Sequence, residues 1–155
     1  MLDAKGNVKI IDFGFSTCIP NDKKIKIFCG TPSYMAPEIV AKKEFCGPPA
    51  DIWASGVLLF AFFCGCFPFR GQNDKDLYKK IMKCELVIPD HVPSGPRAIL
   101  SKILQLDPEV RPSASELYCD AWVQGINNHQ SVGSGGSMDI KSGRSYSSNP
   151  PLNQT

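Results

Sequence analysis

Residues 30–38 read Gly-Thr-Pro-Ser-Tyr-Met-Ala-Pro-Glu, and this stretch is the most informative part of the sequence. Three other stretches accompany it along the chain. Asp-Phe-Gly at 12–14 precedes it, Asp-Ile-Trp-Ala-Ser-Gly at 51–56 follows it, and Asp-Pro-Glu-Val-Arg-Pro at 107–112 comes last. Each stretch alone is short enough to occur by chance, but their order and spacing together form a specific pattern.

The length and composition of the chain limit the classes of protein to which it can belong. The chain has 155 residues and a mass of 17.0 kDa, with 43% hydrophobic and 21% charged residues. These values are typical of a globular domain and exclude a wholly disordered, collagen-like or multi-span membrane chain. The net charge of +2 is too small to favour binding to nucleic acid or to an anionic membrane surface.

The N-terminal part of the chain predicts little helix. Met1 to Asp12 predicts a β-hairpin whose two short strands meet at a turn over Gly6 and Asn7, because both residues tolerate a positive φ. Residues 15–31 show no sustained periodicity, and we expect a loop there.

The rest of the chain predicts a helical body followed by a tail. Apolar residues recur at three- and four-residue spacing in three bounded segments, which we expect to be helices: 77–84, 96–106 and 114–123. From Asn127 onward the sequence is rich in Asn, Ser, Gly and Pro and poor in large apolar residues. We expect a disordered tail over 127–155.

An uncharged run from Ile52 to Phe69 has the length at which a membrane span becomes a candidate. Gly65 and Pro68 should end the helix, which leaves Asp51–Cys64 as its helical part. A helix of about 14 residues reaches only ~21 Å of a hydrocarbon core of ~30 Å. We therefore expect a fully buried core helix and no membrane span.

The cysteines bear on the cellular compartment. The chain has seven, an odd number, without a secretory signal, and Cys64 and Cys66 lie inside the apolar run. This pattern favours buried, reduced thiols in an intracellular, cytoplasmic protein over a disulfide framework. Zinc is the competing interpretation, but the only histidines, His91 and His129, are remote from the cysteine pair in sequence.

In their order and spacing these stretches, together with Phe67-Pro68-Phe69, resemble the C-terminal lobe of eukaryotic protein kinases over roughly Met1 to Trp122. The motif Gly-Thr-Pro ahead of Ala-Pro-Glu resembles that of the Ser/Thr branch of the family. The overall pattern is similar to that of the calcium/calmodulin-dependent and AMP-activated-like groups of this branch. The resemblance implies an α+β protein-kinase-like fold, with a mainly helical C-terminal lobe, the N-terminal β-hairpin and no N-terminal lobe. It implies a partial kinase domain over 1–126.

The resemblance further implies that ATP and Mg²⁺ bind near the Asp-Phe-Gly stretch. Asp12 would be the catalytic carboxylate and the metal ligand that holds Mg²⁺ against the phosphates. Phe13 would pack beneath the site, and Gly14 would give the backbone its freedom to switch between two states. Met1 would lie under the adenine ring, where an apolar side chain suits a flat aromatic ligand.

A protein substrate would bind at the loop that precedes Ala-Pro-Glu. Thr31 would line the catalytic site for the substrate hydroxyl. Phe28, Cys29, Gly30 and Pro32 would form the wall that receives the residue after the phosphoacceptor. The implied reaction is transfer of the ATP γ-phosphoryl group to a Ser or Thr hydroxyl.

Three further residues have structural roles under this resemblance. Glu38 is expected to pair with Arg111 in a buried contact that ties the activation segment to the helical body. Asp51 can be the N-cap of the apolar helix or can brace the catalytic loop, and the two roles are compatible.

The sequence also lacks several parts of a complete kinase domain. It contains no Gly-rich phosphate loop, no strand Lys paired with a helix Glu, and no His-Arg-Asp loop. We therefore expect the chain to begin inside the domain of a longer Ser/Thr kinase and to be inactive alone. The alternatives are a genuinely short, non-catalytic kinase-like module that binds a kinase partner or a substrate, and a membrane-attached protein built on the apolar run.

Overall fold

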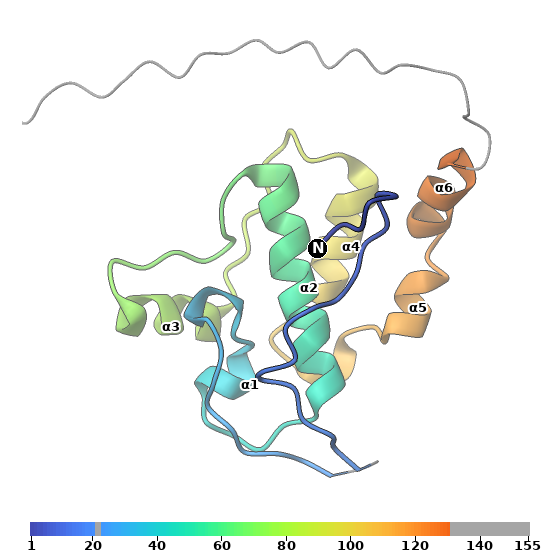
Figure 1. Ribbon diagram of the computed structural model, residues 1–155. Coiled ribbons are helices and arrows are strands. Elements are labelled where there is room, and N and C mark those ends of the chain that lie inside the picture. The colour runs from blue at the N-terminus through green and yellow to red at the C-terminus, as the bar shows by residue number, and fades with distance from the viewer. Residues whose placement is uncertain (21–22, 131–155) are drawn as a thin grey trace, which may run out of the picture.

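The chain folds as a set of shorter helices around one long helix (Figure 1). The computed structural model describes residues 1–20 and 23–130, and within this part six α-helices and two 3₁₀ helices form but no strand does. In chain order they are η1 Pro32–Tyr34, α1 Pro37–Val40, α2 Gly47–Cys64, α3 Asp74–Lys83, α4 Ser94–Ile103, η2 Pro108–Val110, α5 Ala114–Tyr118 and α6 Ala121–Gln130.

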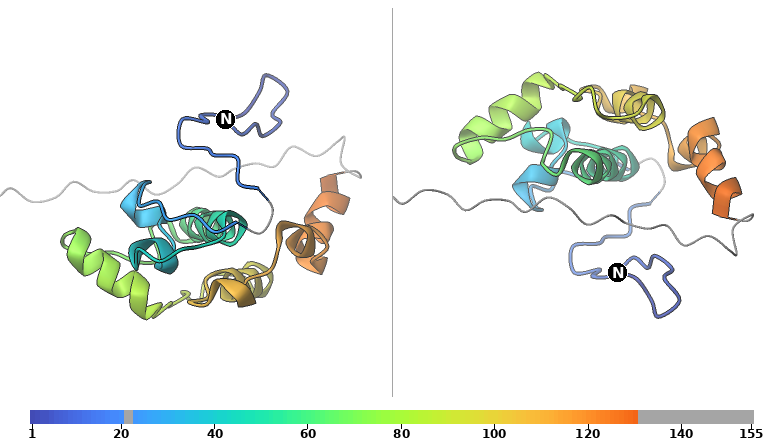
Figure 2. Two further views of the ribbon diagram at one scale, coloured as in Figure 1. Left: turned by 90° about the horizontal axis from the view of Figure 1, so that it is seen from below. Right: turned by 90° about the horizontal axis from the view of Figure 1, so that it is seen from above.

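Helix α2 is the central element. In Figures 1 and 2, α4 runs beside α2, while α1 and α3 lie on one side of this pair and α5 and α6 on the other. Trp53, Val57 and Phe60 of α2 are buried. Gly65 ends the helix with a φ of 65°, and its N–H donates to the Ala61 carbonyl at 2.9 Å. The predicted end of this helix is therefore confirmed.

The start and the burial of α2 differ from the prediction. The helix begins at Gly47 with Cys46 as its N-cap, so Asp51 lies inside the helix and is not its cap. The sequence prediction missed this start because prolines stand at positions 48 and 49. Proline is nevertheless compatible with the first helical positions, where its missing N–H is not needed. Leu58 and Phe62 are 43% and 76% exposed, so the helix is not fully buried.

The longer helix also changes the comparison with a membrane span. With 18 residues it extends ~27 Å, and by length and composition alone it could cross a membrane. A third of this segment (33%) is buried against the rest of the protein, and the core helix of a globular protein has the same length and composition.

The core forms where α2 meets α4 and the segment that follows α2. Trp53 stacks on Phe69, with ring centroids 5.7 Å apart and planes inclined by 6°. Gly56 lets α4 approach closely, because a Cβ at this position would collide with Ile103 and lie 3.0 Å from Leu104 Cδ2. The contact between the two helices thus depends on a residue without a side chain.

Helices α3 and α4 occupy two of the predicted segments with shifted ends. α3 begins at Asp74, before the predicted Leu77, because Asn73 Oδ1 accepts the Asp76 N–H at 3.0 Å and caps the helix. It ends at Lys83, where the next residue has a φ of 50°. α4 spans Ser94–Ile103 rather than 96–106, because Leu104 leaves the helical conformation.

The single helix predicted over 114–123 is two helices. α5 begins at a capping box, in which Ser113 Oγ accepts the Glu116 N–H at 3.2 Å, and α5 ends at Tyr118. Asp120 Oδ1 then accepts the Trp122 N–H at 3.0 Å and starts α6. A side chain that bonds to the backbone in this way competes with continuation of a helix.

Helix α6 runs to Gln130, which corrects one predicted boundary. Asn127 to Gln130 is helical, so the disorder predicted from Asn127 is wrong for these positions. The remainder of the predicted tail, 131–155, lies outside the described residues.

The N-terminal residues pair as a short antiparallel turn in which no strand is assigned: the Lys9 N–H donates to the Met1 carbonyl at 2.8 Å and the Asp3 N–H to the Asn7 carbonyl at 2.9 Å. Leu2 and Val8 make one antiparallel bridge, and the Asp3 carboxylate accepts the N–H groups of Lys5 and Asn7 at 2.9 and 2.8 Å. Figure 2 shows this segment standing apart from the helices. A two-stranded hairpin without a third strand or a helix against it has too little support to extend.

All seven cysteines are free thiols. Cys64 and Cys66 are half-buried rather than buried as predicted, and three other cysteines are exposed: Cys18, Cys29 and Cys119. Burial raises the pKa of the Cys64 thiol, and the neighbouring Cys66 adds to the increase. Cys64 is therefore protonated at neutral pH.

Candidate functional site

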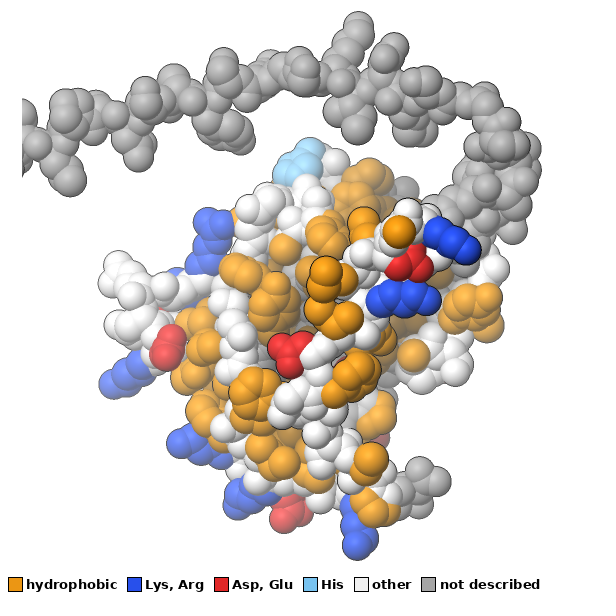
Figure 3. All heavy atoms as spheres, viewed as in Figure 1, with side chains coloured by type: hydrophobic (Ala, Val, Ile, Leu, Met, Phe, Trp, Pro, Cys, Tyr) orange, Lys and Arg blue, Asp and Glu red, His pale blue; other side chains and the backbone are white. Residues whose placement is uncertain are grey.

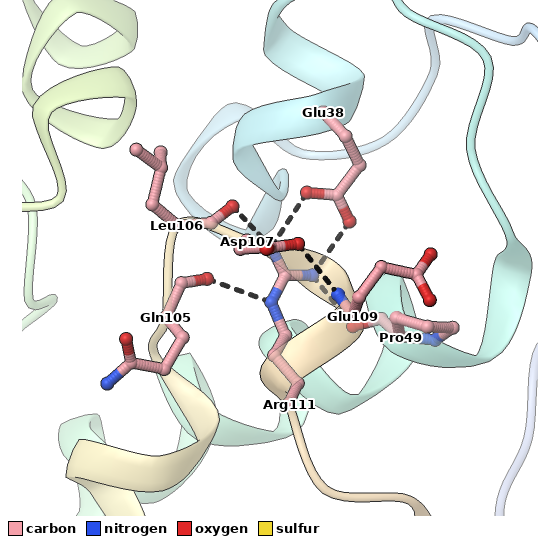
Figure 4. Close-up of polar contacts among 7 residues, drawn as sticks. All are labelled: Glu38, Pro49, Gln105, Leu106, Asp107, Glu109 and Arg111. Carbon is pink, nitrogen blue, oxygen red and sulfur yellow. Dashed lines mark hydrogen bonds and ion pairs between the residues drawn. The ribbon is translucent and has the colours of Figure 1, made fainter.

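Arg111 and Glu38 form a buried ion pair (Figure 4). The Nη1 and Nη2 atoms of Arg111 lie 2.7 Å from Oε1 and 2.7 Å from Oε2 of Glu38. The other guanidinium N–H groups donate to the carbonyls of Pro49 at 3.0 Å, Gln105 at 2.9 Å and Leu106 at 3.3 Å. All five donors of the guanidinium are therefore used.

The surroundings of this pair are dry and partly aromatic. The guanidinium carbon of Arg111 lies 5.0 Å from the centroid of the Trp53 ring. The Arg111 side chain is 0% exposed and that of Glu38 is 7% exposed. The pair joins α1 to the residue that follows η2, across 73 positions of the chain. Because every donor is occupied, the pair connects two segments and leaves no guanidinium N–H for a ligand.

The residues predicted to bind the substrate lie directly before α1. Gly30 has a φ of 118°, which glycine adopts without strain. The Thr31 carbonyl accepts the Tyr34 N–H at 3.0 Å, and Pro32 begins η1. The side chains of Thr31 and Cys29 are exposed, and the Thr31 hydroxyl makes no capping hydrogen bond. The hydroxyl is therefore accessible from solvent.

Phe28 contacts two residues that the sequence motifs did not include. Its ring meets that of Tyr78 edge-on, with centroids 6.0 Å apart, and Lys42 Nζ lies 5.1 Å from the Phe28 centroid. An antiparallel bridge between Ile25 and Phe45 brings this loop against the residues after α1. Contacts between distant elements leave no local sequence signal, which is why Lys42 and Tyr78 were not predicted.

The Asp-Phe-Gly stretch lies in the exposed N-terminal segment. Asp12 has a φ of 64°, and its Oδ1 accepts the Gly14 N–H at 3.3 Å. Phe13 is 67% exposed and Met1 is 75% exposed. The predicted packing of Phe13 beneath a site is not formed, because most of its ring is open to solvent. Among the described residues no hydrogen bond or ion pair joins Asp12 to Thr31 or Arg111.

Asp12 supplies a single carboxylate toward a metal ion. Within residues 1–20 and 23–130, no group of three or more His, Cys, Asp or Glu side chains is close enough to hold a metal. Mg²⁺ requires octahedral oxygen ligands and is bound in phosphoryl-transfer sites by one or two carboxylates plus phosphates. The described residues therefore do not form a complete Mg²⁺ site by themselves.

Asp51 is exposed in the early part of α2. It lines a cavity of about 330 Å³ together with residues of the N-terminal loop, among them Phe15 and Thr17. Its predicted capping role is wrong, because Cys46 occupies the N-cap position. The bracing role stays a prediction.

These features define the class of protein. The chain belongs to the protein kinase family, because the family model described as "Protein kinase domain" matches residues 1–123. The matched range contains the Asp-Phe-Gly stretch, the loop that is predicted to bind substrate and both members of the buried ion pair. The family predicted from the motif order is therefore confirmed.

The relatives are Ser/Thr protein kinases, which confirms the predicted branch. The chain is 39% identical over 125 residues to a SNF-related serine/threonine-protein kinase of Rattus norvegicus. It is 36% identical over 129 residues to the SNF1-related protein kinase catalytic subunit alpha KIN12 of Arabidopsis thaliana. It is 37% identical over 124 residues to the serine/threonine protein kinase OSK3 of Oryza sativa subsp. japonica.

The matches differ in how much of each protein they cover. They include 81%, 83% and 80% of this chain, but 17%, 25% and 24% of the respective relatives. The chain thus spans a quarter or less of the length of these curated relatives.

Proposed function

We propose that this chain is the part of a Ser/Thr protein kinase that carries the activation segment, the substrate-binding loop and the helical body of the C-terminal lobe. The whole enzyme transfers the ATP γ-phosphoryl group to Ser or Thr hydroxyls of a protein substrate. The Glu38–Arg111 pair carries the proposal, because it anchors the substrate loop to the helical body.

This anchoring supports a role in substrate positioning. The bidentate contact restrains α1, and η1 and Thr31 precede α1 directly in the chain. Phosphoryl transfer is accelerated mainly by positioning and by charge stabilisation. A loop held at its C-terminal end presents Phe28 and Thr31 to a peptide in one orientation.

Asp12 has the chemistry of a metal ligand in the whole enzyme. When bound there, Mg²⁺ neutralises charge on the ATP phosphates. The Gly14 N–H donates to Oδ1 of Asp12, and Oδ2 is open to a ligand on this exposed segment. The exposed Phe13 and Met1 are then covered by nucleotide and by parts of the enzyme outside these 155 residues.

We infer that residues 1–155 do not transfer phosphate by themselves. They contain no Gly-rich loop, no paired strand Lys and no His-Arg-Asp base. Among the described residues, no group of three or more His, Cys, Asp or Glu side chains lies close enough to hold a metal ion with Asp12. Without the missing groups most of the positioning and charge stabilisation is lost.

The test extends the coding sequence on the 5′ side of the Met1 codon. We expect codons for His-Arg-Asp and an Asn there. The extended protein should phosphorylate a generic Ser/Thr substrate with ATP and Mg²⁺, and Asp12→Ala should reduce the rate by at least about a hundredfold. Residues 1–155 alone should give no more transfer than their own Asp12→Ala variant. An in-frame stop codon directly before Met1, or Asp12-dependent transfer by the 155 residues alone, contradicts the proposal.

A kinase-like binding module is the second candidate, favoured by the exposed apolar side chains of the N-terminal segment. Val8, Ile10 and Phe15 are 78%, 85% and 81% exposed. Hydrophobic side chains are spread widely over the face shown in Figure 3. An apolar patch of this kind marks a surface for a partner. A stop codon directly before Met1, with one cooperative thermal transition of the chain, favours this candidate over the first.

A further inference from the structure

Lys42 lies just after α1, at a position where helices commonly place a glycine. Its φ is 54°, in the left-handed region. The Lys42 N–H donates to the Ile39 carbonyl at 2.9 Å, and the Lys43 N–H donates to the Glu38 carbonyl at 3.1 Å. These two hydrogen bonds form a Schellman motif, whose left-handed residue is usually glycine because a Cβ there is strained. The end of α1 therefore holds Lys42 in a conformation that its side chain disfavours.

The Lys42 side chain reaches the loop that is predicted to bind substrate. Its Nζ lies 5.1 Å from the centroid of the Phe28 ring, and the Phe28 ring meets that of Tyr78 edge-on at 6.0 Å. Phe28 is nevertheless 44% exposed, so much of this residue remains accessible to a ligand. A peptide that contacts Phe28 therefore also meets the Lys42 ammonium, and this site is not purely apolar.

No ion pair among the described residues neutralises the Lys42 ammonium. The two glutamates that are closest to Lys42 in sequence are Glu38 and Glu44. Glu38 is paired with Arg111. Glu44 is exposed and lines a separate cavity together with Lys43, and Lys42 does not line this cavity. The charge of Lys42 is therefore available to a ligand.

The other charged residues around Phe28 do not cancel this positive charge. On α3, Asp74 and Lys75 precede Tyr78 by about one helical turn, and their opposite charges offset each other. Lys26 is exposed and lies two residues before Phe28 in the chain. The surroundings of Phe28 are therefore complementary to an anionic side chain.

We propose that Lys42 is a specificity-determining residue, which selects protein substrates that carry an aspartate or glutamate directly after the phosphoacceptor. The carboxylate of that substrate residue accepts hydrogen bonds from the Lys42 ammonium beside the Phe28 ring. The inference rests on the proposed function, in which the loop from Phe28 to Pro32 receives this residue, and it adds the chemical class of the substrate.

Other side chains at this substrate position are disfavoured for two reasons. A lysine or arginine would meet the like charge of Lys42. A large apolar side chain would remove water from the ammonium without supplying a hydrogen-bond acceptor. The expected order of preference is therefore acidic, then neutral, then basic.

Fluorescence anisotropy with the 155-residue chain measures this preference without requiring phosphoryl transfer. Three labelled heptapeptides consist of alanine with a central serine, which is followed directly by glutamate, glutamine or lysine. We expect the glutamate peptide to bind about threefold to fivefold more tightly than the glutamine peptide. The lysine peptide should bind most weakly.

Substitutions test whether Lys42 causes the preference. Lys42→Met removes the charge and keeps a long side chain, so it should bind the glutamate and glutamine peptides equally, with its affinity for the glutamine peptide unchanged. Lys42→Arg should keep the preference, because the charge remains. Lys43→Met is the matched control and should also keep it, because Lys43 is an exposed lysine that lines the separate cavity. Thermal melting checks that every variant is folded.

Three results overturn the proposal. The first is that the unchanged chain binds the glutamate and glutamine peptides equally, or binds neither. The second is a preference that persists in Lys42→Met, and the third is an equal loss of preference in Lys43→Met. If Lys42→Met does not fold, Lys42→Gly decides in its place, because glycine adopts a left-handed φ without strain and also removes the ammonium. A preference that persists in Lys42→Gly also overturns the proposal.

Activity measurements on the extended protein separate this inference from the proposed function. Its kcat/KM for the glutamate peptide should exceed that for the glutamine peptide about threefold to fivefold, and Lys42→Met should abolish the difference. Transfer without this difference overturns the inference and leaves the proposed function standing. Absence of transfer to every peptide contradicts the proposed function, and the binding measurement then still decides the role of Lys42.

Discussion

Arg111 and Asp12 are both charged residues of the motif set, but their surroundings are opposite. Arg111 is buried, and its hydrogen-bond partners come from α1, from the start of α2 and from the chain after α4. Asp12 is exposed, and its carboxylate accepts a hydrogen bond from Gly14 in its own loop. The helical body therefore completes the site of Arg111, whereas the N-terminal segment leaves Asp12 without partners from the body.

This contrast separates two kinds of motif residue. A structural motif residue is recognisable in the folded chain because its partners are all present. A catalytic motif residue such as Asp12 keeps its identity in the sequence, but its geometry depends on ligands and on groups from elsewhere. Substitutions in the helical body should therefore change the stability of the fold strongly, whereas substitutions in the N-terminal segment should change it only weakly.

The largest effect is expected for Glu38→Ala. This variant leaves the buried Arg111 guanidinium without its counter-charge, which typically costs about 3–5 kcal/mol of unfolding free energy. Urea denaturation followed by circular dichroism measures the change. Glu44→Ala is the control, because Glu44 is exposed, and it should change stability by less than about 0.5 kcal/mol. Equal effects of the two variants would show that the pair does not hold the body together.

Gly56→Ala is expected to have the next largest effect. The added methyl group would collide with Ile103 and crowd Leu104, and overpacking of this kind costs about 1–3 kcal/mol. Gly125→Ala is the matched control, because nothing lies within 4 Å of the added methyl group there. The control should be neutral or gain up to about 1 kcal/mol from helix propensity. A neutral Gly56→Ala would mean that α4 can move away from α2 without loss.

A smaller effect on stability is expected when the pH is lowered. The Lys102 ammonium and the Trp122 N–H hold the pKa of Asp120 below its ordinary value of 3.8. A carboxyl whose pKa is lower in the folded state stabilises the fold above its unfolded pKa, and this contribution is lost as the pH falls through the folded value. The melting temperature should therefore fall between about pH 5 and pH 3, and less so in Asp120→Asn. An identical decrease in the variant would exclude Asp120 as a cause.

The smallest effect is expected for Ile10→Ser. Ile10 is 85% exposed in the N-terminal segment, and exposed substitutions usually change stability by less than about 0.5 kcal/mol. The urea midpoint should match that of the unchanged chain, while solubility should rise because an apolar side chain is removed. A destabilisation comparable to that of Gly56→Ala would show that this segment packs on the body in solution.

The sequence predicted those parts of the fold whose signals are local or carried by motifs. The end of α2 was predicted because Gly65 supplies a left-handed residue. Membership of the kinase family followed from the order of five short stretches.

Other features depend on competition between interactions and could not be predicted. The break between α5 and α6 arises because Asp120 caps a new helix where periodicity alone continues the old one. The N-terminal pairing stays limited to one bridge, and Phe13 stays mostly exposed, because the described residues provide no covering layer for this segment. The contact of Lys42 with Phe28 joins separate elements and has no sequence signature.

The separation of Glu38 and Arg111 has a consequence for folding kinetics. Bringing together residues 73 positions apart closes a loop at an entropic cost of about 4 kcal/mol. A buried ion pair also becomes favourable only after neighbouring helices have excluded water. The pair is therefore expected to form after α2 and α4 have packed, so its loss should speed unfolding more than it slows refolding. On this view the ion pair determines the lifetime of the folded chain, whereas the packing of α2 and α4 determines how fast that state is reached.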